Sequence, residues 1–141
     1  MKNLFLTFLF LAIITPLLAQ KNMKTPKPYT ILVLMNASSK WLSLTRDERN
    51  KYFEKKVIPI FEKVSKSVNV RLFDSEYFHA KVSDFMIVST SNLDDYKLFI
   101  ELLRDTKIYG EPYFDIVDII VGQEDAFLDF NELLKKENDE K

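Results

Sequence analysis

Residues able to do acid–base or metal chemistry concentrate in one stretch of this chain, Val68–Thr90. It holds the only histidine, His79, and an imidazole titrates near neutral pH and binds metal ions. A lone imidazole in a chain without cysteine lacks the companions of a zinc site, so we interpret His79 first as an ordinary residue of the connection between two strands. The same stretch carries five further charged side chains: Arg71, Asp74, Glu76, Lys81 and Asp84.

Three carboxylates of this stretch, Asp74, Glu76 and Asp84, offer the oxygen ligands that Ca²⁺ and Mg²⁺ prefer. They are unevenly spaced, and Asp74 and Glu76 share one strand face, where like charges repel. Pairing with basic side chains is the better interpretation, and we expect no metal site. The expected partners are Arg71, Lys81 and Arg104.

Two aspartates, Asp115 and Asp118, interrupt the most apolar segment of the chain, Tyr113–Val121. Residues three apart on a regular strand point to opposite faces, so we do not expect these two carboxylates to act as a pair. A carboxylate such as Asp118 that faced an apolar interior would have a raised pKa, as a general acid or base requires. A buried ion pair explains the same residues.

Four apolar runs rich in β-forming residues predict the strands that position these groups. The first run is apolar on both alternating faces, as expected of a strand that is covered on both sides. The second places Arg71, Phe73 and Tyr77 on one face, opposite a face of valine and leucine. The predicted strands are Tyr29–Met35, Val68–Tyr77, Asp84–Thr90 and Tyr113–Val121.

Capping signals and helical spacing predict the helices between these strands. Thr45 and Glu48 form a capping box, and the apolar stripe that follows reaches Val64, with a kink expected about one turn before Pro59. The other predicted helices are one capped by Asn92 and stopped by Gly110, and a short amphipathic one over Glu124–Lys136.

The resulting order of strand, helix, strand, strand, helix and strand is that of the ferredoxin-like split β-α-β unit. This α+β fold has a four-stranded antiparallel sheet with its two main helices on one face. The first and last predicted strands, however, are apolar on both faces. A second copy packed on the open face is the simplest cover, which predicts a homodimer with the architecture of a dimeric α+β barrel.

Composition narrows the class of partner and the compartment. The 141-residue chain has a net charge of -1, which leaves no basic excess for a nucleic acid, and its 2 glycines are too few for a phosphate-cradling loop. Lys2, an apolar run and Ala19 placed for cleavage are typical of a secretory signal. We expect residues 1–19 to be a signal peptide, 20–28 a flexible lead-in, 29–136 the α+β domain and 137–141 a charged tail. The mature protein is then exported, periplasmic or secreted, with no membrane association once the signal is removed.

Several pieces of the sequence are specific enough to compare with known families. They are Trp41-Leu42, Phe73-Asp74-Ser75-Glu76, Ser83-Asp84, Leu103-Arg104-Asp105-Thr106 and Pro112-Tyr113-Phe114 through Asp118-Ile119-Ile120. Through them the segment from Tyr29 to Phe130, close to the whole mature domain, resembles the darcynin family. The resemblance implies a dimeric α+β barrel. The family has no established activity, so it implies no catalytic residues for this chain.

These observations predict a protein that binds a small apolar or aromatic molecule in the interior of the dimer. The candidate ligand-binding residues are Arg71, Phe73 and Tyr77 on one strand face, together with Trp41, His79 and Asp118. Trp41 is also interpretable as a residue that only packs in the core or at a subunit contact. Some barrels of this kind hold haem through a histidine on a helix, and no predicted helix here has one, so we expect no cofactor.

Two further functions stay open at this point. The first is a cofactor-free monooxygenase or isomerase of the same fold, which would depend on Asp118, His79 or Arg71. The second is a structural or partner-binding dimer without catalysis and without a cavity. The volume of a pocket at the interface between the two sheets of the dimer separates this last function from the other two.

Overall fold

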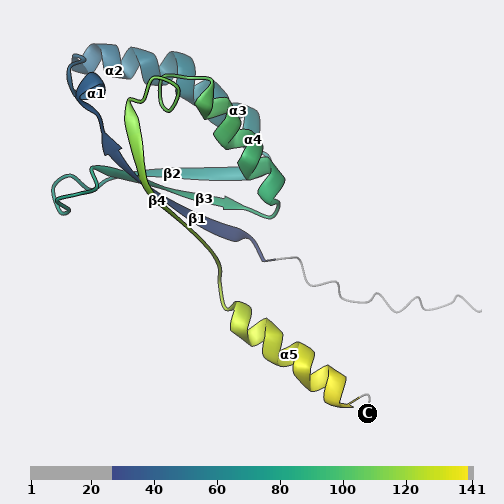
Figure 1. Cartoon of the computed structure of the whole chain (residues 1–141). Coiled ribbons are helices and arrows are strands. Elements are labelled where there is room, and N and C mark those ends of the chain that lie inside the picture. Colours follow the sequence, from purple (N-terminus) through teal and green to yellow (C-terminus); the bar gives the residue numbers. More distant parts are fainter. Residues whose placement is uncertain (1–26, 140–141) are drawn as a thin grey trace, which may run out of the picture.

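A four-stranded antiparallel sheet with helices on one face is the main feature of the computed structural model, which describes residues 27–139 (Figure 1). The strands lie in the order β2-β3-β1-β4. Their bounds are β1 Tyr29–Ala37, β2 Val68–Asp74, β3 Asp84–Thr90 and β4 Phe114–Gln123. The predicted signal peptide and most of the predicted lead-in lie outside the described residues.

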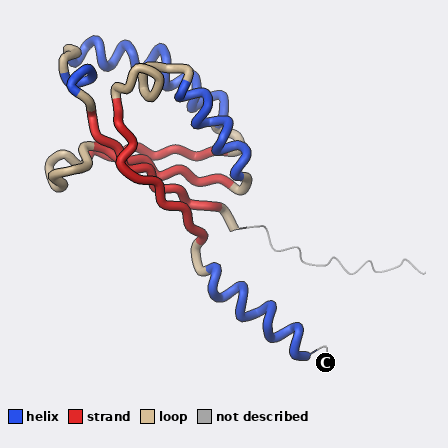
Figure 2. Tube along the Cα trace, viewed as in Figure 1, coloured by secondary structure: helices blue, strands red, loops and turns tan. Residues whose placement is uncertain are grey.

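The strand pairing confirms the ferredoxin-like α+β fold. β1 pairs antiparallel with both β3 and β4, and β2 pairs with β3. β2 ends at Asp74, before the predicted end at Tyr77, because the backbone turns at Ser75. The carbonyl oxygen of Ser75 accepts hydrogen bonds from the amides of Phe78 and His79, both at 2.9 Å. Figure 2 shows the helices that follow β1 and β3 gathered on one side of this sheet.

The capping box begins the first long helix as predicted. The Thr45 amide donates to Glu48 Oε2 at 2.7 Å, and the Glu48 amide donates to Thr45 Oγ1 at 3.3 Å. The helix then runs in three parts: α2 Arg46–Tyr52, a π-helical turn η1 Phe53–Val57, and α3 Ile58–Val64. The π turn lies about one turn before Pro59, where the kink was expected, because proline cannot donate a backbone hydrogen bond and crowds the preceding turn.

A short helix that the pattern did not predict, α1 Ser39–Leu42, precedes this long helix. Its cap is Ser38, whose side chain accepts from the Trp41 amide at 3.4 Å and donates to the carbonyl oxygen of Pro112 at 2.8 Å. α1 therefore fixes Trp41 next to the loop that enters β4.

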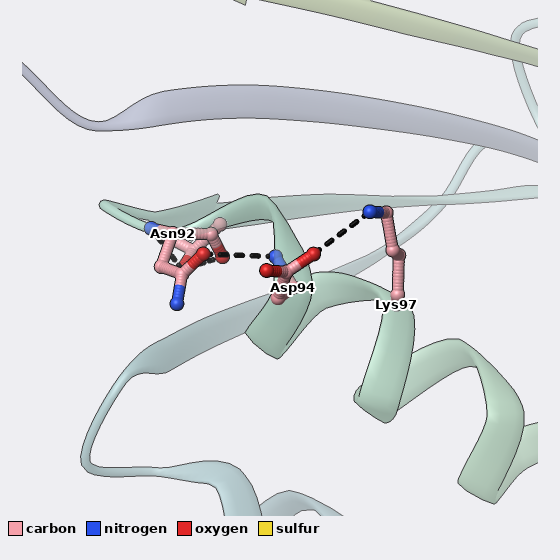
Figure 3. Close-up of polar contacts among 4 residues, drawn as sticks. Asn92, Asp94 and Lys97 are labelled. Atoms are coloured by element: carbon pink, nitrogen blue, oxygen red, sulfur yellow. Dashed lines mark hydrogen bonds and ion pairs between the residues drawn. The ribbon is translucent and has the colours of Figure 1, made fainter.

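Helix α4, Leu93–Arg104, begins at Asn92 as predicted. Asn92 Oδ1 accepts from the Asp94 amide at 3.0 Å, and Lys97 Nζ meets Asp94 Oδ1 at 2.7 Å (Figure 3). The predicted stop at Gly110 is wrong, since α4 ends at Arg104 and irregular turns follow. Gly110 serves a close approach instead: a Cβ there would lie 2.7 Å from the carbonyl oxygen of Arg104 and 2.8 Å from that of Thr106.

The core lies between the helices and one face of the sheet. On that face Ile31, Val33 and Val88 are fully buried, and Phe99 of α4 is fully buried against them. Burial of this apolar surface is the main contribution to folding, because each large side chain contributes roughly 1.5–3 kcal/mol. On the opposite face, which no described helix covers, Leu32 and Leu34 are only half-buried.

A β-bulge in β4 changes the predicted placement of its two aspartates. The register of β4 with β1 shifts between Leu34 and Met35, so that Asp115 lies opposite Asn36 and Asp118 lies opposite Leu34. Asn36 and Leu34 share one face of β1, and therefore both aspartates are on the open face. The expectation of opposite faces was wrong, because regular alternation does not hold across a bulge.

The last two elements are apolar yet exposed. β4 leads away from the helices into α5, Ala126–Asp139, which projects beyond the sheet (Figure 1). In β4, Ile116, Ile119, Ile120 and Val121 are between 42% and 52% exposed. The predicted apolar stripe of α5 is present but uncovered, with Phe127 at 73%, Phe130 at 57% and Leu133 at 63% exposure. Among the described helices, none has the length and apolar character needed to cross a lipid bilayer.

The two glycines of the chain offer a matched test of this packing. Gly110→Ala is expected to lower the free energy of unfolding by about 1–3 kcal/mol, because the new methyl group meets backbone that cannot rotate away. Gly122→Ala is expected to change it by no more than about 0.5 kcal/mol, since nothing lies within 4 Å of the added atom. Urea denaturation of both variants measures the difference. Equal stability of the two would contradict the close approach at Gly110.

Candidate functional site

A cavity of about 410 Å³ lies between the helix-covered face of the sheet and the long helix. Its volume falls within the roughly 300–1,000 Å³ of typical small-molecule sites. Side chains from both layers form the apolar part of its wall, and among them are Met35, Phe53, Val57, Phe61, Leu72 and Met86. Leu72 of β2 and Leu42 of α1 are 45% and 58% exposed, so these two residues mark where the cavity reaches the surface.

Aromatic rings close one end of this cavity. The Trp41 ring lies 5.3 Å from that of Tyr113 and 5.2 Å from that of Phe114, and Tyr52 packs edge-on against Trp41 at 6.4 Å. Tyr52 is held in turn by its hydroxyl, which accepts from the Lys107 amide at 2.8 Å. Both interpretations of Trp41 hold together: it packs in an aromatic cluster, and it lines a cavity.

Arg49 brings a positive charge to the wall from α2. Its Nε is buried and has no hydrogen-bond partner among residues 27–139. Arg49 is absent from the ion pairs formed within residues 27–139. A buried donor of a charged group without a partner costs on the order of 1–3 kcal/mol, so this geometry favours an acceptor at that point.

Acidic side chains face the cavity from the ends of β2 and β3. Asp84 lies directly opposite Asp74 in the register of the two strands, and both line the cavity with Glu76. Burial raises the pKa of the Asp84 carboxyl, and the neighbouring charges of Asp74 and Glu76 raise it further, while the hydrogen bond from the Ser83 hydroxyl opposes them. Asp84 therefore holds a proton more readily than an ordinary aspartate does.

The predicted ion pairs of these carboxylates are not formed. Within the described residues Arg104 Nη1 pairs with Glu101 Oε1 at 2.9 Å, and neither Arg71 nor Lys81 forms an ion pair. The guanidinium of Arg71 lies 5.0 Å from the centre of the Phe73 ring instead. Pairing with Arg71 fails because Arg71 lies on the open face of β2, whereas Asp74 and Asp84 lie on the helix-covered face.

The hydroxyl groups of Tyr109 and Tyr96 form no strong hydrogen bonds within the described residues. The Tyr109 hydroxyl donates to Met35 Sδ at 3.5 Å, and burial together with the nearby Tyr96 raises the pKa of Tyr109. The Tyr96 hydroxyl is buried and finds no hydrogen-bond partner in the described part of the chain. Both phenols therefore remain protonated at neutral pH, as donors in an apolar setting.

The candidate residues from the sequence fall into three places. Trp41 and Phe73 line the cavity. Arg71 and Asp118 lie on the open face of the sheet, at the opposite edge strands β2 and β4. Tyr77 and His79 are exposed in the connection between β2 and β3, with Tyr77 at 78% exposure.

The ring of His79 has a structural role in that connection. Its Nδ1 accepts hydrogen bonds from the amides of Lys81 at 3.1 Å and Val82 at 3.0 Å. No group of three or more histidine, aspartate or glutamate side chains within residues 27–139 is arranged to hold a metal ion.

Arg49 and the helix side of the cavity were not predicted. The sequence signal was present, because Arg46 and Arg49 are three residues apart on a helix and so share a face. The sequence does not reveal which face of α2, a helix rich in charged residues, turns toward the sheet.

Solved structures with the same fold belong to proteins of quite different sequence. The chain is similar to a chlorite dismutase from Candidatus Nitrospira defluvii in complex with imidazole, with a TM-score of 0.61 and 15% identity, over 70% of this chain and 41% of that one. It is also similar to a haem-binding protein from Thermus thermophilus, with a TM-score of 0.61 and 14% identity, over 70% of this chain and 40% of that one. This chain thus spans about two fifths of these proteins, and the similarity shows the fold.

Proteins of closer sequence carry the family name. A darcynin homolog from Streptomyces avermitilis is 33% identical over 104 residues, which cover 74% of this chain and 85% of the relative. Darcynin 1 from Acinetobacter baumannii is 38% identical over 89 residues, which cover 63% of this chain and 98% of the relative. Residues 19–132 match the family described as darcynin, a domain of unknown function. The chain belongs to the darcynin family.

Proposed function

We propose that this protein binds a small, mainly apolar molecule in the cavity between the helices and the sheet. The observation that carries the proposal is the buried Nε of Arg49, a charged donor without a partner among the described residues, at the wall of a cavity whose centre is lined by apolar side chains. A ligand with an aromatic or aliphatic body and one acceptor or anionic group satisfies both parts of this wall.

The cavity lies on the other side of the sheet from the face that the strand pattern favoured. Arg71 belongs to the open face. The Phe73–Phe85 stack, with ring centres 4.7 Å apart, also belongs to that face by strand register, although both residues contribute to the cavity wall as well. That face suits a second copy of the chain rather than a small molecule, because Leu34 and Phe85 are half-buried there and no described helix covers them. The proposed assembly is therefore a homodimer with one ligand site in each copy.

The haem bound by the Thermus protein does not carry over to this chain through a histidine. His79 is the only histidine of the sequence, it does not line the cavity, and its Nδ1 accepts two backbone hydrogen bonds. The proposed ligand is accordingly a small organic molecule.

Export remains part of the proposal, on the strength of the apolar segment before Ala19. Amino-terminal sequencing of protein from the periplasm or the medium is expected to begin at Gln20. Protein found only inside the cell, with Met1 retained, would contradict export.

Binding of the anionic dye 1-anilinonaphthalene-8-sulfonate tests the assignment of the site. Arg49→Met is expected to weaken dye binding about tenfold or more, because the sulfonate loses a charge-assisted hydrogen bond. Arg71→Met is the matched control, and it should bind the dye as the unchanged protein does. Dye fluorescence and quenching of the only tryptophan, Trp41, measure both affinities. The opposite pattern, with Arg71→Met weakened and Arg49→Met unaffected, would move the site to the open face.

A catalytic role is the second candidate function, and the raised pKa of the Asp84 carboxyl favours it. A carboxyl group whose pKa is raised by burial and by neighbouring carboxylates is suited to exchange a proton with a bound molecule. The reaction class that fits is proton abstraction or transfer without a cofactor.

The raised pKa of Asp84 predicts a dependence of stability on pH. A raised folded-state pKa means that folding favours the protonated carboxyl, so the stabilisation is present below the ordinary value of 3.8 and is lost as pH rises through the raised value. Asp84→Asn, which keeps an acceptor for the Ser83 hydroxyl, is therefore expected to stabilise the protein at pH 7 by about 0.5–1 kcal/mol, after allowance for screening of a half-exposed group. At about pH 3 the gain should vanish. Urea denaturation at both pH values measures it, and an equal effect at each pH would refute the proton shift.

A further inference from the structure

We propose that α5 is an arm that docks on a second copy of the chain and covers the mouth of that copy's cavity. The covering role rests on the proposed function, whereas the docking does not. Four features of the described residues carry the inference.

The direction of the arm is fixed by its own chain. Lys27 Nζ lies 2.9 Å from Asp129 Oδ2 and 3.2 Å from the carbonyl oxygen of Asp125, and Gln123 Nε2 donates to the carbonyl oxygen of Lys27 at 2.9 Å. Asp125 takes a φ of 50° at the turn between β4 and α5. These contacts tie the base of α5 to the start of β1, so the arm points away from its own helix layer (Figure 1).

The apolar stripe of the arm has no cover within the described residues. Phe127, Phe130, Leu133 and Leu134 share one side of α5 and are between 43% and 73% exposed. β4 exposes further apolar side chains, and monomeric proteins rarely expose large apolar surfaces to water. A stable arm in water therefore needs a partner surface.

The mouth of the cavity offers an apolar surface of the right kind. Leu42 and Leu72 border the mouth and are both exposed, and Leu72 belongs to β2, a free edge of the sheet. No described segment of the same chain covers these two leucines. A helix laid across them buries their side chains together with its own stripe.

The net charges of the arm and of the long helix beside the mouth are opposite. Residues 124–139, which contain the arm, have six acidic and two basic side chains. Residues 46–66, the long helix beside the mouth, have seven basic and four acidic ones. Opposite net charges favour contact between the arm of one copy and the helix layer of another, while they disfavour contact between two arms. The partner is therefore a second copy that uses a different surface from the arm itself, in a reciprocal exchange.

Paired substitutions on the arm test whether the stripe makes the contact. Phe130→Asp is expected to raise the dissociation constant of the dimer at least about thirtyfold, because it places a charge in the apolar contact. Leu128→Asp makes the same kind of change on the opposite side of the helix, and it should have less than about a threefold effect by the same conversion. Sedimentation equilibrium of the purified proteins measures both constants. A monomeric unchanged protein, or equal effects of the two substitutions, would overturn the proposal.

Cross-linking tests where the arm docks. Because the chain has no cysteine of its own, only the introduced cysteines react. A mixture of Leu134→Cys and Leu42→Cys proteins should form a mixed dimer with a short bismaleimide, whereas a mixture of Leu134→Cys and Leu98→Cys proteins should not, since Leu98 is exposed on α4 away from the cavity. Cross-linking through Leu98 in place of Leu42 would overturn the docking site. If the dye fails to bind while the Leu42 cross-link forms, the proposed ligand site fails and the arm stands.

Discussion

The sheet of this protein has two apolar faces and a single layer of helices. β1 lies between two neighbouring strands, with Ile31 and Val33 buried under the helices and Leu32 and Leu34 on the other side. The helices can cover only one of these faces, because both long connections of a split β-α-β unit cross on the same side. The open face, the exposed β4 and the projecting α5 all follow from this shortage of cover. The exposed apolar side chains of β4 and α5 are those that the described helices do not cover.

The cavity has a division of charge that its position in the fold explains. The positive side, Arg46 and Arg49, comes from the first turn of α2, and the negative side comes from the ends of β2 and β3. The two sets meet because β1 ends at the same end of the sheet at which β2 and β3 are connected, and α1 and α2 follow β1 directly. A pocket with both signs of charge around an apolar centre selects for the orientation of a bound molecule as well as for its size.

Local signals in the sequence were enough for most of the fold. The capping box at Thr45, the Asn92 cap and β3 were predictable because each depends on residues only a few positions apart. The π turn was predictable as a kink, since the consequence of Pro59 is also local. The bulge opposite Met35, the end of α4 at Arg104 and the short helix around Trp41 were not, because each is decided by contacts with distant segments.

The candidate site was less predictable than the fold for the same reason. Of the candidate residues, Phe73 and Trp41 line the cavity, whereas Tyr77 is exposed, because residue type alone does not decide which aromatic side chains are covered. Arg49 was missed because its significance is the lack of a partner, which appears only when every neighbouring atom has a position. Conversely, His79 drew attention as a titratable group, yet its imidazole holds a turn through two backbone amides.

The bulge in β4 has an effect on the symmetry of the molecule. By placing Asp115 and Asp118 on one side, it gives the open face two negative charges along one edge strand, while Arg71 stands on the other edge strand of that face. The face therefore carries a charge gradient across its width. Two such faces that meet with like edges together set the aspartates against each other, and two that meet with unlike edges bring Arg71 toward them. One inserted residue in a strand thus determines the direction of the charge gradient on the open face.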